Sequence, residues 1–305
     1  MKFIKSLLTV ALPLFLLNSC VSGQNDLDLS AYEYRDTKNL VKFVYDAAKI
    51  LEQKGIKAFS HFNSNRKLYR LNNYYLYIYE TNGTNIFHAG ITEFEGHNLM
   101  DIQDLQGKKI TNAVLEALEN PNNPHGWVHY TWWEPGKFFP ESKSSCNVKV
   151  ITPEGKELFV GAGLNQPHEE KEFVRICVDT AVDLIKKEGS NAFDKIRDPL
   201  SQFVFRNIRV FVFYENGEIV ISPTINNCQI QHNIIDSKDE VGHFPFKKAL
   251  KTLATHNKTW EVFMAKNRDK RILIKKALYL RKLQFNNRTL LVGAVTDLPR
   301  PSWSN

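Results

Sequence analysis

Apolar and polar residues follow two different periods along the chain, and each period predicts one type of element. In residues 40–51 and 173–185 apolar side chains recur every three or four positions, a spacing typical of an amphipathic helix with one buried face. Segments rich in tyrosine, phenylalanine, valine and isoleucine follow each helix, and that composition favours strands. The apolar helix positions are Leu40, Phe43, Val44, Ala47, Ile50 and Leu51 in the first helix and Phe173, Val174, Cys177, Ala181, Leu184 and Ile185 in the second.

Short turns connect the predicted strands of the first half. The segment 74–80 runs into Asn82-Gly83, a strong hairpin signal, and Pro153-Glu154-Gly155 separates two further strands. Consecutive strands joined by short turns pair antiparallel, so a long helix followed by such a sheet predicts an α+β fold. The predicted elements after the first strand are a short helix over 110–118 and strands over 127–133, 146–151 and 158–163.

This plan occurs twice in the sequence. The residues Gly55, Ala58 and Phe59 recur 134 positions later, as does the strand and turn of residues 77–83. A third block, residues 159–162, recurs at 291–294. A period this long indicates a duplicated domain rather than a solenoid. We therefore predict a first domain over 34–165, a second domain over 166–298 and a tail over 299–305.

The N-terminus carries an export signal. Lys2 and Lys5 accompany an apolar run that ends at Leu17, which is too short to span a bilayer and typical of a signal peptide. The sequence Leu17-Asn18-Ser19-Cys20 resembles the bacterial lipobox, in which the cysteine is lipidated, although Asn18 stands where a smaller residue is usual. We predict a signal peptide over 1–19, lipidation at Cys20 and a linker over 20–33, on the periplasmic or cell-surface side of the envelope. The alternative is an ordinary signal peptide in which Cys20 has no role.

Composition and charge exclude several classes of protein. A hydrophobic content of 43% with 20 Phe and 11 Tyr argues against intrinsic disorder. The net charge of +7 is compatible with anionic ligands, while export argues against nucleic acid as a partner. The sequence has no G-x-S-x-G, P-loop, H-E-x-x-H or C-x-x-C motif and no Cys/His cluster with metal-ligand spacing. We therefore predict no enzymatic activity, no cofactor and no metal site.

The first half carries an ordered set of motifs over residues 70–165. They are Tyr75-Leu76-Tyr77-Ile78-Tyr79, Asn82-Gly83, His88, Gly96-His97-Asn98-Leu99-Met100-Asp101, Gly126-Trp127-Val128, Tyr130, Trp132, Pro135-Gly136, Lys143 and Gly161-Ala162-Gly163. This order resembles a Cache domain, the PAS-like extracellular sensor module of bacterial receptors, and in particular the single-Cache subtype that senses small carboxylates. The second half keeps the skeleton but not these residues. Together the halves resemble a tandem, or double, Cache arrangement with a degenerate second domain.

The resemblance implies a fold and a function. It implies two PAS-like Cache domains, each a long N-terminal helix packed on an antiparallel sheet. The chain would then be an exported lipoprotein that binds a small organic acid in its first domain. It would serve as a sensory or solute-binding component for a separate membrane partner, such as a signalling receptor or a transporter. The alternative is a structural or interaction lipoprotein that has the same fold and no small-molecule ligand.

Strand alternation and the resemblance together nominate a ligand site. Along 75–79 the tyrosines share one face, while Leu76 and Ile78 share the other, which we assign to the long helix. Carboxylates are bound by cationic and O–H or N–H donors against aromatic walls. Each candidate also has a structural interpretation: a sheet tyrosine, a core tryptophan, a turn histidine or a solvated loop lysine. The nominated ligand-binding residues are Tyr77, Tyr79, His88, Trp127, Tyr130, Trp132 and Lys143.

Overall fold

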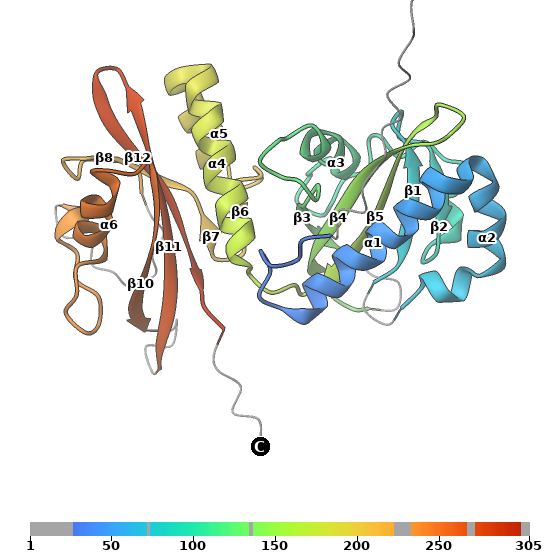
Figure 1. Ribbon diagram of the computed structural model, residues 1–305, viewed down its shortest axis with the longest axis horizontal. Helices are drawn as coiled ribbons and strands as arrows, with labels where there is room; N and C mark the ends of the chain where they lie inside the picture. Colours follow the sequence, from blue (N-terminus) through green and yellow to red (C-terminus); the bar gives the residue numbers. More distant parts are fainter. Residues whose placement is uncertain (1–26, 72–73, 134–136, 223–232, 267–271, 300–305) are drawn as a thin grey trace, which may run out of the picture.

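The computed structural model describes residues 27–71, 74–133, 137–222, 233–266 and 272–299. Within these ranges the chain forms two bodies of similar architecture, each with a long helix packed on a five-stranded sheet (Figure 1). The predicted signal peptide and the lipidation site Cys20 lie outside the described residues. No helix in the described ranges is both long enough and apolar enough to cross a membrane.

The first sheet is antiparallel throughout. Its strand order is β2-β1-β5-β4-β3, so that consecutive strands of the chain are not all neighbours. The first and last strands in sequence meet at the centre of the sheet, which ties the two ends of the first domain together. The strands are β1 (Leu76–Glu80), β2 (Asn85–His88), β3 (Val128–Trp132), β4 (Glu141–Ile151) and β5 (Glu157–Asn165).

Helices cover both faces of this sheet. The helix α1 (Arg35–Lys54) buries Leu40, Val44 and Leu51 against the sheet face that carries Leu76 and Ile78. The helix α3 (Ile110–Leu118) packs on the opposite face, beside the tyrosines of β1. The prediction that the aliphatic face of β1 lies under the long helix is therefore confirmed. The remaining helical segments of this half are η1 (Gly55–Lys57), α2 (Ala58–Ser64), η2 (Arg66–Tyr69) and η3 (Thr92–Phe94).

The second sheet repeats the first. Its order, β9-β8-β12-β11-β10, is the same permutation of strands. In both sheets a central glycine pairs with the first strand, as Gly161 with Tyr77 and Gly293 with Phe211. The strands are β8 (Phe211–Tyr214), β9 (Ile219–Ile221), β10 (Lys258–Lys266), β11 (Leu273–Phe285) and β12 (Arg288–Asp297). The helices are α4 (Lys171–Glu188), η4 (Gly189–Asn191), α5 (Ala192–Arg197), η5 (Ile234–Asp236) and α6 (Pro245–Leu253), and β6 (Val204–Phe205) with β7 (Ile208–Arg209) forms a small hairpin.

The long helix of the second half lies between the two sheets (Figure 1). It packs on β11 and β12 of its own sheet. Its other side meets the first domain, where the ring of Phe173 lies 4.9 Å from that of Trp127 and 4.7 Å from that of His129. The α+β fold and the twofold repetition of helix and antiparallel sheet are as the sequence predicted.

The segment before α1 packs on the first domain although it falls in the predicted linker. Tyr32 is buried, and its hydroxyl accepts a 2.7 Å hydrogen bond from Nε1 of Trp127. The same hydroxyl contacts Nδ1 of His125. The packing on the first domain therefore includes residues before the long helix, and Tyr32 connects them to the loop that precedes β3.

Candidate functional site

The tyrosine face of the first sheet and helix α3 enclose a small cavity of about 40 Å³. It lies on the side of the sheet opposite α1, between β1, β3 and the helix. Aromatic side chains form most of its wall, and none of the residues described there is acidic. The lining residues are Tyr75, Tyr77, Tyr79, His88, Phe94, Ile102, Ile110, Thr111, Val114, Tyr130, Trp132 and Phe159.

Five of the seven nominated residues meet at this cavity. They come from three strands: Tyr77 and Tyr79 from β1, His88 from β2, and Tyr130 and Trp132 from β3. Period-two alternation explains the convergence, because residues two apart on one strand point to the same side of the sheet. The structure does not place Trp127 and Lys143 on the wall of the cavity.

His88 is held as a neutral hydrogen-bond donor. Its Nδ1 accepts hydrogen bonds from the backbone N–H groups of Ile91, at 2.8 Å, and Gly90, at 3.3 Å. Burial, with the positive charges of Lys143 and Arg66 nearby, lowers the pKa of His88 to about 3. A neutral imidazole that accepts at Nδ1 carries its proton on Nε2. His88 therefore contributes an N–H donor and no net charge at neutral pH.

Trp132 presents a buried donor with no acceptor. Its Nε1 is inaccessible to solvent, and no atom of the described residues accepts a hydrogen bond from it. A buried donor left without a partner costs about 1–3 kcal/mol, and such groups are uncommon in native structures. Because Trp132 lines the cavity, a ligand atom that accepts from this indole would remove that cost.

The tyrosines of the cavity stay protonated. Burial raises the pKa of Tyr77, of Tyr79 and of Tyr130 above the ordinary value, so each keeps its hydroxyl proton at physiological pH. Tyr77 donates its proton to Oδ1 of Asn147 at 2.8 Å, which fixes this ring in place. The ring of Tyr79 stacks on Phe159 with centroids 5.1 Å apart. These two residues shape the wall, whereas Tyr130 lines it beside Trp132 and its hydroxyl also meets Ser145.

Lys143 supplies a buried positive charge one layer behind the wall. It lies on β4 opposite Tyr130, and its side chain is only 1% exposed. Its Nζ donates a 2.9 Å hydrogen bond to the hydroxyl oxygen of Tyr75 and lies 4.1 Å from the centroid of that ring. The cation thus reaches the cavity through Tyr75, a lining residue that was not among the nominated ones.

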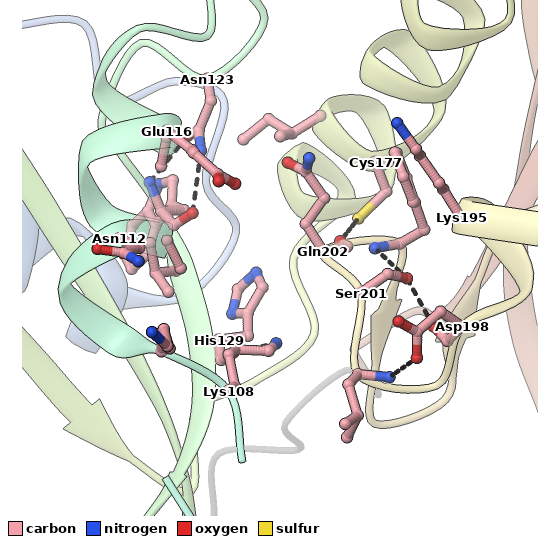
Figure 2. Close-up of a pocket in the computed structure, with 18 of the residues that line it drawn as sticks. Lys108, Asn112, Glu116, Asn123, His129, Cys177, Lys195, Asp198, Ser201 and Gln202 are labelled. Carbon is pink, nitrogen blue, oxygen red and sulfur yellow. Dashed lines mark hydrogen bonds between the residues drawn. The ribbon is translucent and has the colours of Figure 1, made fainter. Parts of the chain in front are cut away.

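Trp127 faces the other way, into a larger cleft between the two domains. This cleft has a volume of about 580 Å³ and is lined by α3 and β3 on one side and by α4 and the segment 195–203 on the other (Figure 2). Trp127 precedes Val128, so strand alternation sends it to the side opposite Tyr130. Trp127 is thus the one nominated aromatic residue that the fold separates from the others.

Two polar side chains of the cleft donate to backbone carbonyl groups. The Nζ of Lys108 donates to the carbonyl oxygen of His129 at 2.8 Å, and Sγ of Cys177 donates to the carbonyl oxygen of Gln202 at 3.4 Å (Figure 2). Burial lowers the pKa of His129 to about 3 and raises that of Cys177 to about 12, so both are neutral. The cleft is larger than the cavity under α3, but among its described lining residues no buried polar side-chain atom lacks a hydrogen-bond partner.

The second domain has different side chains at the positions of the cavity. The strand register places Phe211 and Phe213 where the first domain has Tyr77 and Tyr79. These rings pack on Phe246 of α6, with centroids 6.2 and 5.8 Å away. Phe263, opposite Lys276, takes the position of Tyr130. The described part of this domain therefore lacks the hydroxyl donors that the first domain has at these positions.

Helix α3 contributes lining residues that the sequence interpretation did not assign to the site. Ile110, Thr111 and Val114 close the cavity from above the sheet, together with Phe94. Their signal in the sequence was the apolar spacing of four between Ile110 and Val114. That spacing predicts a buried face but does not say which side of the sheet it covers. Among the described residues, no group of three or more His, Cys, Asp or Glu side chains is arranged to hold a metal ion.

A match to a family model agrees with this architecture. A family model described as a Cache domain, dCache_2, matches residues 31–293. No curated protein matches the chain. Among solved structures, a Cache chemosensory domain described as recognising carboxylic acid is 22% identical, with 43% of this chain and 94% of that chain covered and a TM-score of 0.35.

Two further solved structures are chemotaxis proteins. A methyl-accepting chemotaxis protein from Vibrio parahaemolyticus is 17% identical, covering 43% of this chain and 88% of its own, with a TM-score of 0.34. The ligand-binding domain of the amino acid chemoreceptor PctB of Pseudomonas aeruginosa, in complex with L-Arg, is 12% identical. It covers 86% of this chain and 87% of its own, with a TM-score of 0.30.

Proposed function

Because this chain belongs to the Cache domain family, a family of sensory ligand-binding domains, we propose that its first domain binds a small monocarboxylate in the cavity under α3. The observation that carries this proposal is the unpartnered Nε1 of Trp132. A carboxylate oxygen is the strongest common acceptor for such a donor in a site from which water is excluded.

The electrostatics of the cavity favour an anion. The neutral His88 adds a second N–H donor, Tyr130 adds an O–H donor, and Lys143 places a positive charge behind Tyr75. No carboxylate side chain lines the described wall, so a bound anion meets no like charge there. A cationic or strongly basic ligand would find no counter-charge among the lining residues that the structure describes.

The size of the cavity limits the ligand. A water molecule needs about 10–15 Å³ of such space, so a cavity of about 40 Å³ accommodates only a few non-hydrogen atoms. This volume fits monocarboxylates of about two or three carbons, such as acetate, propionate or pyruvate. Dicarboxylates would bring a second charge into an apolar wall and exceed the space.

We also propose that the protein is an exported lipoprotein held to the envelope through Cys20. The lipobox-like sequence supports the anchor, and the family supports an extracellular or periplasmic location. A protein of this kind would pass its ligand state to a separate membrane partner. Replacing Cys20 by alanine should release the protein from the membrane fraction, and retention of the Cys20→Ala variant there would contradict the anchor.

A thermal-shift titration of the purified protein tests the ligand. A ligand that binds only the folded state raises the melting temperature as its concentration exceeds the dissociation constant. We expect acetate, propionate or pyruvate to raise it, and acetamide and succinate at matched ionic strength to leave it unchanged. A protein that none of these monocarboxylates stabilises would instead support an interaction protein without a small-molecule ligand.

A further inference from the structure

One strand of the second sheet, β10, is exposed on a face where the corresponding strand of the first sheet, β3, is covered by the second domain. In the first domain Trp127 is 4% exposed, because Phe173 of α4 packs edge-on against its ring. The adjacent His129 stacks on Phe205 of β6, with ring centroids 3.9 Å apart. The second domain therefore covers this end of β3.

The equivalent positions in the second sheet are Trp260 and Val262. The register fixes this equivalence, since Val128 pairs with Ser145 in the first sheet as Glu261 pairs with Leu278 in the second. Trp260 is 38% exposed and Val262 is 56% exposed. The ring of Trp260 stacks on Tyr279 at 4.7 Å, so both lie on the side of the sheet that carries α4.

Helix α4 stops short of this edge. It covers β11 and β12, whereas β10 lies at the edge of the sheet beyond them (Figure 1). The uncovered residues on this side are Trp260, Val262 and Met264 of β10 and Leu273 of β11, which we call the β10 face. Exposed apolar patches on edge strands are uncommon in soluble proteins unless they bind a partner.

We propose that the β10 face docks a helix of a partner protein that presents an aromatic side chain from an acidic first turn. The model for this helix is α4 itself, which places Phe173 on Trp127 directly after Glu169, Glu170 and Glu172. The docked helix would continue on the second domain the arrangement that α4 makes on the first. This inference does not depend on the carboxylate ligand.

The charges around the β10 face support an acidic partner. Lys258 and Lys266 lie at the two ends of β10, and Lys275 lies opposite Met264 on β11. Lys266 pairs with Glu240 at 2.9 Å. Within the described ranges neither Lys258 nor Lys275 forms an ion pair, so an acidic helix terminus would find two available cations at the rim. Complementary charge of this kind speeds association and orients the partner.

A second copy of this chain fits the face less well. The helix that corresponds to α4 is α1, which has Asn39 at the position of Phe173 and Lys42 at the position of Ile176. Lys42 is exposed and pairs with Asp46 at 2.6 Å. At these two positions α1 therefore offers an amide and a charged side chain, and it has no aromatic residue where α4 has Phe173.

A designed peptide tests the proposal on the full protein. It carries residues 167–188 with Val174→Gln, Val178→Gln and Ile185→Gln, which replace three buried apolar residues of α4 and keep Phe173 and the acidic turn. We expect saturable binding, followed by fluorescence anisotropy, that weakens at least tenfold with Val262→Glu in the protein. The same loss is expected with Phe173→Ala in the peptide, and rising salt should weaken binding.

A matched control is Ile151→Glu, which places the same charge on a residue of the first domain that is 60% exposed. This variant should bind the peptide as the wild type does, and both variants should melt as the wild type does. Absence of saturable binding, or equal loss in both variants, would overturn the proposal. Two other results would also overturn it. If the protein self-associates and Val262→Glu abolishes this, the face binds a second copy. If the protein binds phosphatidylglycerol vesicles and the same change abolishes that binding, the face binds a lipid surface.

Discussion

Lys143 and Lys276 occupy the same register position in the two duplicated sheets, yet they meet different partners. Lys143 pairs with Asn165 across β4 and β5 and donates its hydrogen bond to Tyr75. Lys276 pairs with Asp297 across β11 and β12 and forms an ion pair with its carboxylate. The second domain thus pairs this lysine with a carboxylate on the neighbouring strand, whereas in the first domain the lysine donates to the hydroxyl of Tyr75, a residue of the cavity wall. This difference is the clearest sign that the duplicated sites have diverged.

The first prediction follows from that difference. Lys143→Met keeps the length of the side chain and removes the charge behind Tyr75, so monocarboxylate affinity should fall by about tenfold or less. The loss should be smaller than for a direct hydrogen bond to a charged group, which contributes about 1.5–3 kcal/mol, because Lys143 donates to Tyr75 and not to the ligand. Titration calorimetry measures the change. The matched variant Lys276→Met should leave affinity unchanged, and an equal loss in both variants would rule out a specific role for Lys143.

Trp132→Phe separates ligand binding from folding. The change keeps an aromatic wall and removes the indole N–H, so affinity for the monocarboxylate should drop about tenfold. The unliganded protein should be as stable as the wild type or slightly more stable, because a buried donor without an acceptor has been removed. Urea unfolding with and without ligand measures both effects. Loss of stability without loss of affinity would show that Trp132 serves only the fold.

The lowered pKa of His88 should make the free energy of unfolding depend on pH. Its pKa in the folded protein, about 3, is below its ordinary value of 6.5, so between these values the unfolded chain binds a proton that the folded chain does not. Stability should therefore fall as the pH drops below about 6.5, by about 2 kcal/mol at pH 5 from this group alone. His129, with its pKa lowered in the same direction, adds to the slope.

His88→Gln supplies the control for that dependence. Glutamine keeps an acceptor and a donor but cannot take up a proton, so the loss of stability between pH 6.5 and pH 5 should become smaller. Urea denaturation at these two values provides the comparison. An unchanged slope in the variant would mean that other groups govern the acid sensitivity.

Tyr32→Phe tests the anchoring of the N-terminal segment. Removing the hydroxyl leaves Nε1 of Trp127 without its 2.7 Å acceptor and breaks the contact with His125. Stability should fall by about 1–3 kcal/mol, since a buried donor loses its partner. Affinity for the monocarboxylate should not change, because Tyr32 lies on the far side of the sheet from the cavity. A change in affinity as large as that in Trp132→Phe would contradict this separation.

Much of the fold could be predicted from the sequence because it is encoded in patterns that the sequence shows directly. Helical spacing marked α1 and α4, and the repeat revealed two domains. The start of β4 was not accessible, since residues 141–145 are polar and do not resemble a strand. They form one because β3 and β5 flank them on both sides and bury Lys143, Ser144 and Ser145. Pairing with strands that are distant in sequence therefore determines that these residues form a strand.

The candidate site could be predicted from the sequence to a similar extent as the fold. Period-two alternation brought Tyr77, Tyr79, Tyr130 and Trp132 to one side of the sheet. The position of α3 over that side, and the covering of Trp127 by Phe173, depend on packing between elements that no local pattern encodes. The position of the Lys143 side chain behind Tyr75 likewise depends on three-dimensional packing.

The indole N–H resonances of the five tryptophans provide the most direct test of the central claim. In protein labelled with ¹⁵N-tryptophan, the resonance of Trp132, assigned with Trp132→Phe, should move downfield on titration with acetate, propionate or pyruvate as its N–H gains an acceptor. The resonances of Trp127 in the cleft and Trp260 on the β10 face should stay in place. A Trp132 resonance that does not move at saturating concentrations of all three acids, or a shift confined to Trp127, would contradict the assignment of the ligand to the cavity under α3.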